Sequence, residues 1–274
     1  MNAVTDFHVH AFPDDLAPRA IRMLNESIPQ ECAAVLDGTI GGLVRSMDGA
    51  GIARSVTCPI ATAPGQVRPI LDWAVSIRSA RIVPFASVHP GCEDMSAEVA
   101  RIAGSGLLGI KLHPLHQDFA ADERRMWPCY RAIADHGLIL VLHCGLDLAF
   151  PAHDERAHPQ RVLNVHRQFP EIPLVATHMS GWKRWEAAAD CLAGTDVYLE
   201  TSYTLDVAPQ ELLAEILERH DPERIVFGTD SPLREQKEAI ELVNRAFPDP
   251  QVRRKVLSGN ADRLLREAAG SRHY

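Results

Sequence analysis

Short apolar runs rich in β-branched residues recur along this chain, and segments with helical spacing separate them. The runs predict eight strands, at residues 4–10, 55–60, 82–89, 107–114, 138–145, 174–180, 197–203 and 225–230. Because the runs are almost continuously apolar, they are typical of a parallel sheet covered by helices. The sequence therefore predicts an α/β fold, a (β/α)8 TIM barrel. An open doubly wound sheet usually has a Gly-rich phosphate loop after its first strand, and this sequence has none there.

The connection between the first two predicted strands is longer than the others. Residues 11–50 contain two stretches with helical spacing, where a barrel needs one helix. We interpret this segment as a helical insertion on the rim of a single domain that covers residues 1–274. No linker-like segment or internal repeat divides the chain. The periodicity is lost at residues 270–274, which are predicted to form a frayed tail.

Composition narrows the class of protein. Hydrophobic residues make up 46% of the 274, enough for a large core. Lys and Arg number 28 against 36 Asp and Glu, and the formal net charge of -8 disfavours nucleic acid or an anionic membrane as partner. The sequence has no long apolar run and no signal-peptide pattern, and its six cysteines form no CxxC pair. These features predict a cytoplasmic protein with reduced thiols.

Polar side chains stand at the ends of most predicted strands. These positions are His8 and His10, Lys111 and His113, His143, His178, Glu200, and Asp230. In a barrel of this type, chemistry takes place at the carboxyl ends of the strands. Each polar residue follows apolar ones, and a polar group so close to the core needs a partner. Imidazoles and carboxylates together are suited to Zn²⁺ and similar divalent ions.

The stretch DFHVHAF at residues 6–12 contains two histidines one residue apart. Strand alternation places Phe7 and Val9 on one face and both imidazoles on the other. Two imidazoles on one face could bind a metal ion; the alternative is an exposed surface strand. A Ser-His-Asp nucleophile is disfavoured because the sequence has no GxSxG motif. Cys144, next to His143, alternates to the opposite face and is predicted to lie in the core.

The motifs DFHVH, GIKLHP, VLHCG, THMSG and GTDSP, in this order, resemble the amidohydrolase superfamily. The most similar branch is the amidohydrolase-related family that includes aminocarboxymuconate semialdehyde decarboxylases. The resemblance covers residues 4–265 and implies a metal-dependent barrel enzyme. It implies that His8, His10 and His143 are metal ligands, and that Asp230 is a ligand that also takes a proton from the metal-bound water. His178 would either bind a second metal or donate and accept a proton next to that water.

Zinc is the first expectation for the metal, with manganese and iron as alternatives, and one ion is favoured over two. In some branches of the superfamily the lysine of the fourth strand is carboxylated and bridges two metals. We favour a free Lys111 that faces an anionic group of the substrate, and a pairing of Lys111 with Glu200 is the structural alternative. His113, Glu200 and Arg156 are the other predicted substrate contacts.

Hydrolysis of a small, anionic amide, lactone or ester is the first expectation for the reaction. Non-oxidative decarboxylation of a small unsaturated or aromatic carboxylate is the alternative. A TatD-like deoxyribonuclease is less favoured, because that type has a glutamate where this chain has Lys111. A barrel that binds a ligand without turnover is also conceivable. A homodimer would be usual for similar proteins, although the sequence shows no signature of one.

Overall fold

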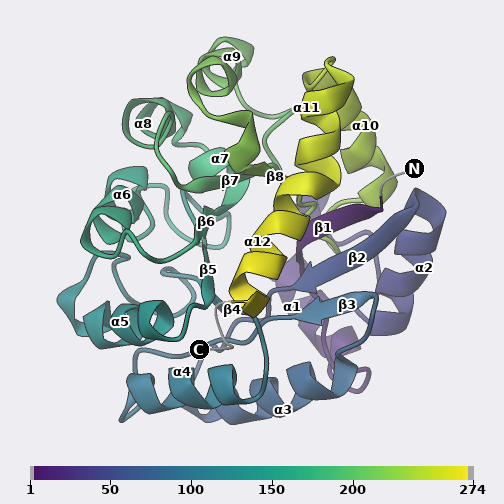
Figure 1. Cartoon of the computed structure of the whole chain (residues 1–274). Coiled ribbons are helices and arrows are strands. Elements are labelled where there is room, and N and C mark those ends of the chain that lie inside the picture. Colours follow the sequence, from purple (N-terminus) through teal and green to yellow (C-terminus); the bar gives the residue numbers. More distant parts are fainter. Residues whose placement is uncertain (1–2, 271–274) are drawn as a thin grey trace.

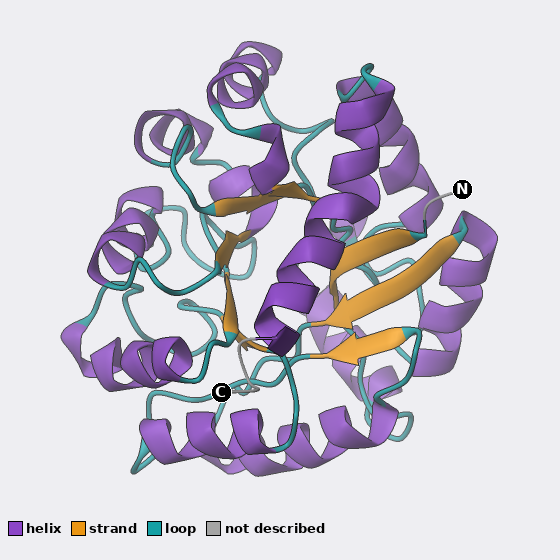
Figure 2. Ribbon diagram, in the orientation of Figure 1, coloured by secondary structure: helices purple, strands orange, loops and turns teal. Residues whose placement is uncertain are grey.

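A computed structural model describes residues 3–270 and shows parallel strands surrounded by helices (Figures 1 and 2). Each predicted run overlaps one strand, and most strands end before the run does, where the chain turns into a loop. The strands are β1 (Val4–Val9), β2 (Ile52–Thr57), β3 (Ile82–Pro84), β4 (Gly109–Leu112), β5 (Ile139–Leu142), β6 (Leu174–Ala176), β7 (Tyr198–Glu200) and β8 (Ile225–Val226).

The strands form a closed ring. They pair in the order β1-β2-β3 and β4-β5-β6-β7-β8, and every pair is parallel. Ala86 pairs with Ile110 and joins the two sheets on one side. Val9 pairs with Ser231 on the other side, and there the amide of Phe7 donates to the carbonyl of Phe227 at 2.8 Å. The predicted (β/α)8 barrel is confirmed.

Helices cover the outside of the ring (Figure 2). They are α1 (Ala17–Ser27), α2 (Ile40–Ala50), α3 (Val67–Ile77), α4 (Met95–Gly104), α5 (Trp127–Asp135), α6 (Pro159–Gln168), α7 (Thr177–Ser180), α8 (Trp185–Cys191), α9 (Gln210–Arg219), α10 (Gln236–Ala246), α11 (Pro250–Arg254) and α12 (Asn260–Gly270). Within residues 3–270, none of these helices combines the length and the apolar character needed to cross a membrane.

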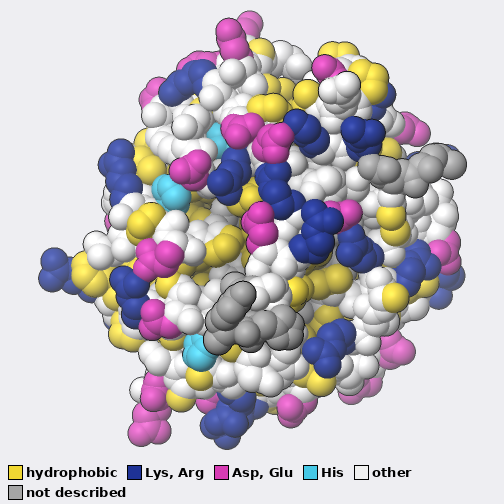
Figure 3. All heavy atoms as spheres, in the orientation of Figure 1, with side chains coloured by type: hydrophobic (Ala, Val, Ile, Leu, Met, Phe, Trp, Pro, Cys, Tyr) yellow, Lys and Arg dark blue, Asp and Glu magenta, His cyan; other side chains and the backbone are white. Residues whose placement is uncertain are grey.

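Helix α12 closes one end of the barrel (Figure 1). Its buried face, which includes Leu264 and Leu265, packs in one cluster with side chains from inside the ring such as Phe7 and Val141. On the surface around α12, basic and acidic side chains lie interspersed (Figure 3). Of the tail predicted at residues 270–274, Gly270 is the last residue of α12, and the remainder lies outside the described residues.

The first strand contains a bulge that the sequence pattern does not show. Asp6 pairs with Ser55 and Val9 pairs with Thr57, so three steps along β1 match two along β2. Phe7 therefore packs inside the barrel, whereas Val9 packs outside the ring against the helices. The prediction that Phe7 and Val9 share one face is wrong, because strict alternation does not continue through a bulge.

The connection between β1 and β2 contains two helices. Helix α2 packs on β2 and is the helix that the barrel needs. Its N-terminus is capped by the side chain of Thr39, which accepts a hydrogen bond from the amide of Gly42 at 2.8 Å. Helix α1 is additional, and its residue Leu24 lines a pocket together with Ile28, which directly follows the helix, and with His178 and Asp230. Helix α1 thus lies at the end of the barrel opposite α12.

Candidate active site

His8, His10 and Asp230 meet where β1 and β8 end. The Nε2 atom of His8 lies 3.2 Å from Nε2 of His10 and 3.4 Å from Oδ1 of Asp230, and His10 Nε2 lies 3.0 Å from the same oxygen. Zn²⁺ holds nitrogen and oxygen ligands at about 2.0–2.1 Å, so two ligands of a tetrahedral site lie about 3.3 Å apart. These three residues, the metal triad below, therefore have the spacing and the donor chemistry of a divalent-cation site.

Glu200 determines which nitrogen of His8 can bind a metal. Its carboxylate is fully buried and accepts a hydrogen bond from Nδ1 of His8 at 3.0 Å. A neutral imidazole with its proton on Nδ1 has its lone pair on Nε2, the atom that faces His10 and Asp230. Gly228 leaves the space for this carboxylate, since a Cβ there would lie 2.2 Å from Oε1 of Glu200. Glu200, predicted to contact substrate, thus contacts His8 and positions it.

Lys111 also lies against His8. Its side chain is fully buried, and Nζ lies 3.2 Å from Nε2 of His8. Burial lowers the pKa of His8 well below its usual value and the charge of Lys111 lowers it further, so this imidazole is neutral. Burial lowers the pKa of Lys111 as well. Lys111 does not line the pocket beside His178 and Asp230, so the structure does not make it a direct substrate contact. That it is free of carboxylation stays a prediction.

Replacing Glu200 with Gln is expected to weaken metal binding about 10–100-fold, the usual effect of losing a carboxylate partner of a ligating histidine. The amide keeps the volume of the side chain but loses the charge that holds the proton on Nδ1 of His8. Titration of metal-free protein with Zn²⁺ against a competing chelator measures the change. Glu218→Gln on the exposed face of α9 is the matched control. Unchanged affinity in Glu200→Gln would show that Glu200 has no positioning role.

His178 lies in a left-handed turn after β6. His178, Met179 and Ser180 have φ angles of 59°, 48° and 66°, which cost about 1–2 kcal/mol for each non-glycine residue. Surrounding contacts hold the turn, among them the thiol of Cys144, which donates to the carbonyl of Ser180 at 2.9 Å. Nδ1 of His178 donates toward the carbonyl and hydroxyl oxygens of Ser202, at 3.3 and 2.9 Å. Its Nε2 therefore keeps a lone pair, and burial lowers its pKa to about 4.

A pocket of about 90 Å³ adjoins His178 and Asp230. Much of its wall is apolar and is formed by Leu24, Ile28, Leu146, Leu148, Ala149, Trp182 and Leu233. The indole Nε1 of Trp182 is buried and has no hydrogen-bond partner among the described residues. A buried indole N–H usually has a partner, so this unpaired donor is unusual for a wall residue of the pocket. The pocket therefore offers a small molecule an apolar surface beside the metal triad.

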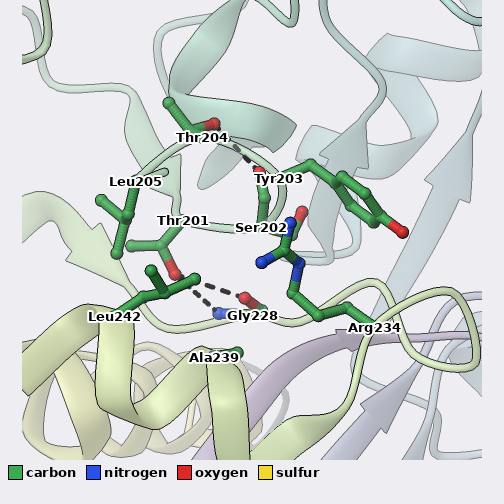
Figure 4. A pocket seen from close by; sticks show the side chains of 9 residues that line it. All are labelled: Thr201, Ser202, Tyr203, Thr204, Leu205, Gly228, Arg234, Ala239 and Leu242. Atoms are coloured by element: carbon green, nitrogen blue, oxygen red, sulfur yellow. Dashed lines mark hydrogen bonds between the residues drawn. The ribbon is translucent and has the colours of Figure 1, made fainter. Parts of the chain in front are cut away.

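A second, smaller cavity lies behind the loop that follows β7 (Figure 4). There the guanidinium of Arg234 lies 4.8 Å from the centre of the Tyr203 ring and pairs with Asp206 at 2.7 Å. The hydroxyl of Thr201 donates to the carbonyl of Gly228 at 3.3 Å. This cavity measures about 10 Å³, which holds about one water molecule. It cannot accommodate a substrate, so the larger pocket is the candidate substrate site.

His143 and His113 form a stacked pair near the same pocket, with ring centres 3.9 Å apart. Nε2 of His143 donates to the carbonyl of Leu146 at 3.0 Å, and burial lowers the pKa of His143 well below its usual value. The His143 ring lies 5.0 Å from that of His178. Neither His143 nor His178 belongs to the metal triad, and their roles as metal ligands stay predictions. His113, predicted to contact substrate, does not line the pocket.

Asp147 is a polar residue of the pocket that the sequence analysis missed. Its Oδ2 atom lies 3.2 Å from Nε2 of His113 and 3.4 Å from Nε2 of His116, and both Asp147 and His116 line the pocket. The available signal was its position, three residues after Cys144 in the loop that follows the fifth strand. Polar residues of such loops are candidates for chemistry in a barrel.

Arg156 lies apart from this group. Its guanidinium makes hydrogen bonds with Asp154 at 2.6–3.0 Å and with Asp118 at 2.7 Å. It does not line the pocket, so the structure does not bring it to the substrate site as predicted.

The buried histidines predict how the stability of the metal-free protein depends on pH. Burial lowers the pKa of His113 to about 3 and that of His178 to about 4, from the ordinary 6.5. Below pH 6.5 the unfolded chain therefore binds protons that the folded chain does not. As the pH is lowered, the free energy of unfolding then decreases by about 1.4 kcal/mol per pH unit for each histidine. Asp6 opposes this trend, because burial raises its pKa to about 7.

We expect the free energy of unfolding to decrease by at least about 1 kcal/mol per pH unit between pH 6.5 and 5. Urea denaturation in the presence of a chelator measures it. His113→Gln should flatten the slope, and the exposed His153→Gln should leave it unchanged. Stability that is constant or increases as the pH falls would contradict the assignment of neutral, buried imidazoles.

Comparison with known proteins bears on this arrangement. The family model described as amidohydrolase matches residues 5–266. No curated protein sequence matches the chain. An uncharacterised TIM-barrel protein from Bordetella bronchiseptica has a similar structure, with 19% identity, a TM-score of 0.76, and 97% of this chain and 99% of that chain covered.

Two other similar structures are named for different enzymatic activities. A dihydroxybenzoic acid decarboxylase from Polaromonas sp., solved with bound manganese and the inhibitor 2-nitroresorcinol, is 16% identical with a TM-score of 0.71 and full coverage of both chains. A probable 2-pyrone-4,6-dicarboxylic acid hydrolase from Acinetobacter baumannii is 15% identical with a TM-score of 0.68, covering 97% of this chain and 99% of that chain. At these identities the likeness establishes the fold and does not distinguish the two reactions.

Proposed function

Because this chain belongs to the amidohydrolase family, as its motifs predicted, we propose that it is a metal-dependent, non-oxidative decarboxylase of a small aromatic or unsaturated carboxylate. The family and the similar structures make it an enzyme of a metal-dependent superfamily. The observation that carries the proposal is the apolar pocket beside the metal triad. An apolar surface removes water from a bound carboxylate, and loss of CO₂ does not require a water molecule to attack.

His8, His10 and Asp230 would hold the metal ion, which fits their spacing and the lone pair that Glu200 leaves on Nε2 of His8. When bound, a divalent ion polarises a carbonyl or carboxylate oxygen and lowers the pKa of water toward about 7. Manganese in the similar decarboxylase makes it a candidate beside zinc. The arrangement supports one ion in the metal triad.

In decarboxylation the bond between a substrate carbon and its carboxylate breaks, the electron pair stays on that carbon, and the carbon takes up a proton. Nε2 of His178 has a lone pair that can accept a proton from a substrate hydroxyl or from water. Asp230, which also lines the pocket, can accept a proton and return it to the carbon. Trp182 lines the same pocket, and its indole N–H has no hydrogen-bond partner among the described residues.

Hydrolysis, the first expectation from the sequence, is the second candidate. It is favoured by the hydrolase among the similar structures, and the same residues could accept the proton of an attacking water. The two reactions differ in their products. Metal-loaded protein is incubated with a panel of hydroxylated aromatic acids and of lactones and amides, and the products are identified by mass. We expect release of CO₂ from an aromatic or unsaturated acid; products heavier by one water would establish hydrolysis instead.

A further inference from the structure

The charged groups of the substrate pocket have one sign. No lysine or arginine is among the described residues that line it, whereas Asp230 and Asp147 both do. Asp230 lies in the metal triad, where a bound cation would offset its charge. Asp147 belongs to a separate group, in the loop after β5, and its carboxylate faces two imidazoles. The nearby Lys183 is exposed and lies 4.7 Å from the centre of the Trp182 ring, where it contacts the aromatic face.

The hydrogen bonds around Asp147 show which of its neighbours donate to its carboxylate. Oδ1 accepts from the amide of Ala149 at 2.8 Å. The amide of His116 donates to Nδ1 of His113 at 3.4 Å, so the proton of the neutral His113 ring is on Nε2, which donates to Oδ2 of Asp147. His113, His116 and Asp147 also have the spacing of a cation site. In the metal-free protein, however, this tautomer places a proton on Nε2, and His113 is a hydrogen-bond partner of the carboxylate.

Asp147 is ionised at neutral pH. Burial opposes its charge, but hydrogen bonds from His113 and His116 outweigh this and hold the pKa of Asp147 well below its usual range. Its side chain is 18% exposed, so a molecule in the pocket can reach it. An ionised carboxylate only accepts hydrogen bonds and repels other anions.

We propose that Asp147, held by His113 and His116, determines specificity for the part of the substrate that lies against the loop after β5. It accepts a hydrogen bond from a hydroxyl or amino group there, and it disfavours substrates that place a second carboxylate there. This inference rests on the proposed function only in taking the pocket as the substrate site. The reaction itself, decarboxylation or hydrolysis, does not enter it.

Binding of metal-directed probes to the metal-loaded protein tests this inference. Benzohydroxamate carries a group that binds metal ions whichever reaction the enzyme performs. Its 3- and 4-amino derivatives add a donor to the far side of the ring, and its 3- and 4-carboxy derivatives add an anion. Isothermal titration calorimetry gives a Kd for each probe. We expect the better amino derivative to bind about 10-fold more tightly than the parent, the usual gain from a hydrogen bond to a charged group. Both carboxy derivatives should bind more weakly than the parent.

Three variants make the assignment specific. Asp147→Asn should abolish most of the amino preference and the discrimination against the carboxy probes, because the amide is uncharged and can donate. His116→Ala should reduce both effects in part. This variant replaces Asp147→Asn as the test if Asp147→Asn does not fold. Asp135→Asn, on the exposed end of α5, should behave like the original protein.

Carboxy probes that bind the original protein as tightly as the parent would overturn the inference. Amino and carboxy preferences that are unchanged in Asp147→Asn would overturn it too. A second metal equivalent in the original protein that is lost in Asp147→Asn would make Asp147 a ligand and refute the tautomer argument. The proposed function fails separately, if the preferences are as expected but no acid in the panel releases CO₂.

Discussion

Replacing Asp230 with Asn is expected to lower turnover at least about 100-fold, the low end for a general acid–base group, while the protein remains folded and retains part of its metal. Asp230 is almost fully buried, and its Oδ1 lies 3.0 Å from His10 Nε2. Asn is nearly the same size and keeps an oxygen that can bind a metal, but it cannot accept a proton. Its backbone has a φ of 61°, a conformation that Asn tolerates as well as Asp does.

Turnover of the substrate found in the product screen, metal content and a thermal unfolding midpoint together test this expectation. Asp14→Asn, at an exposed position before α1, is the matched control. Turnover equal to that of the original protein in Asp230→Asn would show that another group moves the proton. Nε2 of His178 would then be the first candidate.

Replacing His10 with Ala is expected to remove nearly all of the bound metal. The original protein should retain about one equivalent after dialysis against a weak chelator, and the variant less than about a tenth, because only two donors of the metal triad remain. His10 is preferable to His8 for this test. Its side chain is 19% exposed, whereas that of His8 is 1% exposed and contacts Glu200 inside the barrel.

Elemental analysis of the purified proteins measures the metal directly and requires no substrate. His153→Ala, at an exposed position in the loop after β5, controls for nonspecific binding to imidazoles. Metal content at the original level in both His10→Ala and His8→Ala would exclude the metal triad as the site.

The barrel itself was predictable from local pattern. Buried parallel strands produce continuous apolar runs, and the order of eight runs with helical segments between them is a property of the sequence alone. Because the carboxyl ends of barrel strands meet at one rim, polar residues that follow such runs must gather there. His8, His10 and Asp230 therefore come together although Asp230 lies more than 200 residues later in the chain, as their distances of 3.0–3.4 Å show.

What each polar side chain touches was not predictable, because contacts across the ring depend on the depth and direction of every side chain. Glu200 and Lys111 lie near the carboxyl ends of strands, where the pattern predicts substrate contacts. Both side chains instead contact His8. Arg156 lies in the expected loop, but nearby carboxylates hold it outside the pocket.

The strands, their order and the rim at which the metal triad forms thus follow from local properties, namely periodicity and the position of a residue at a strand end. Contacts that form only in the folded chain set the bulge in β1, the tautomer that Glu200 imposes on His8, and the place of Asp147 beside His113. The physical reason is that a tautomer, a pKa and a hydrogen bond arise from atoms that are close in space. For His8 and Glu200 those atoms belong to residues 192 positions apart.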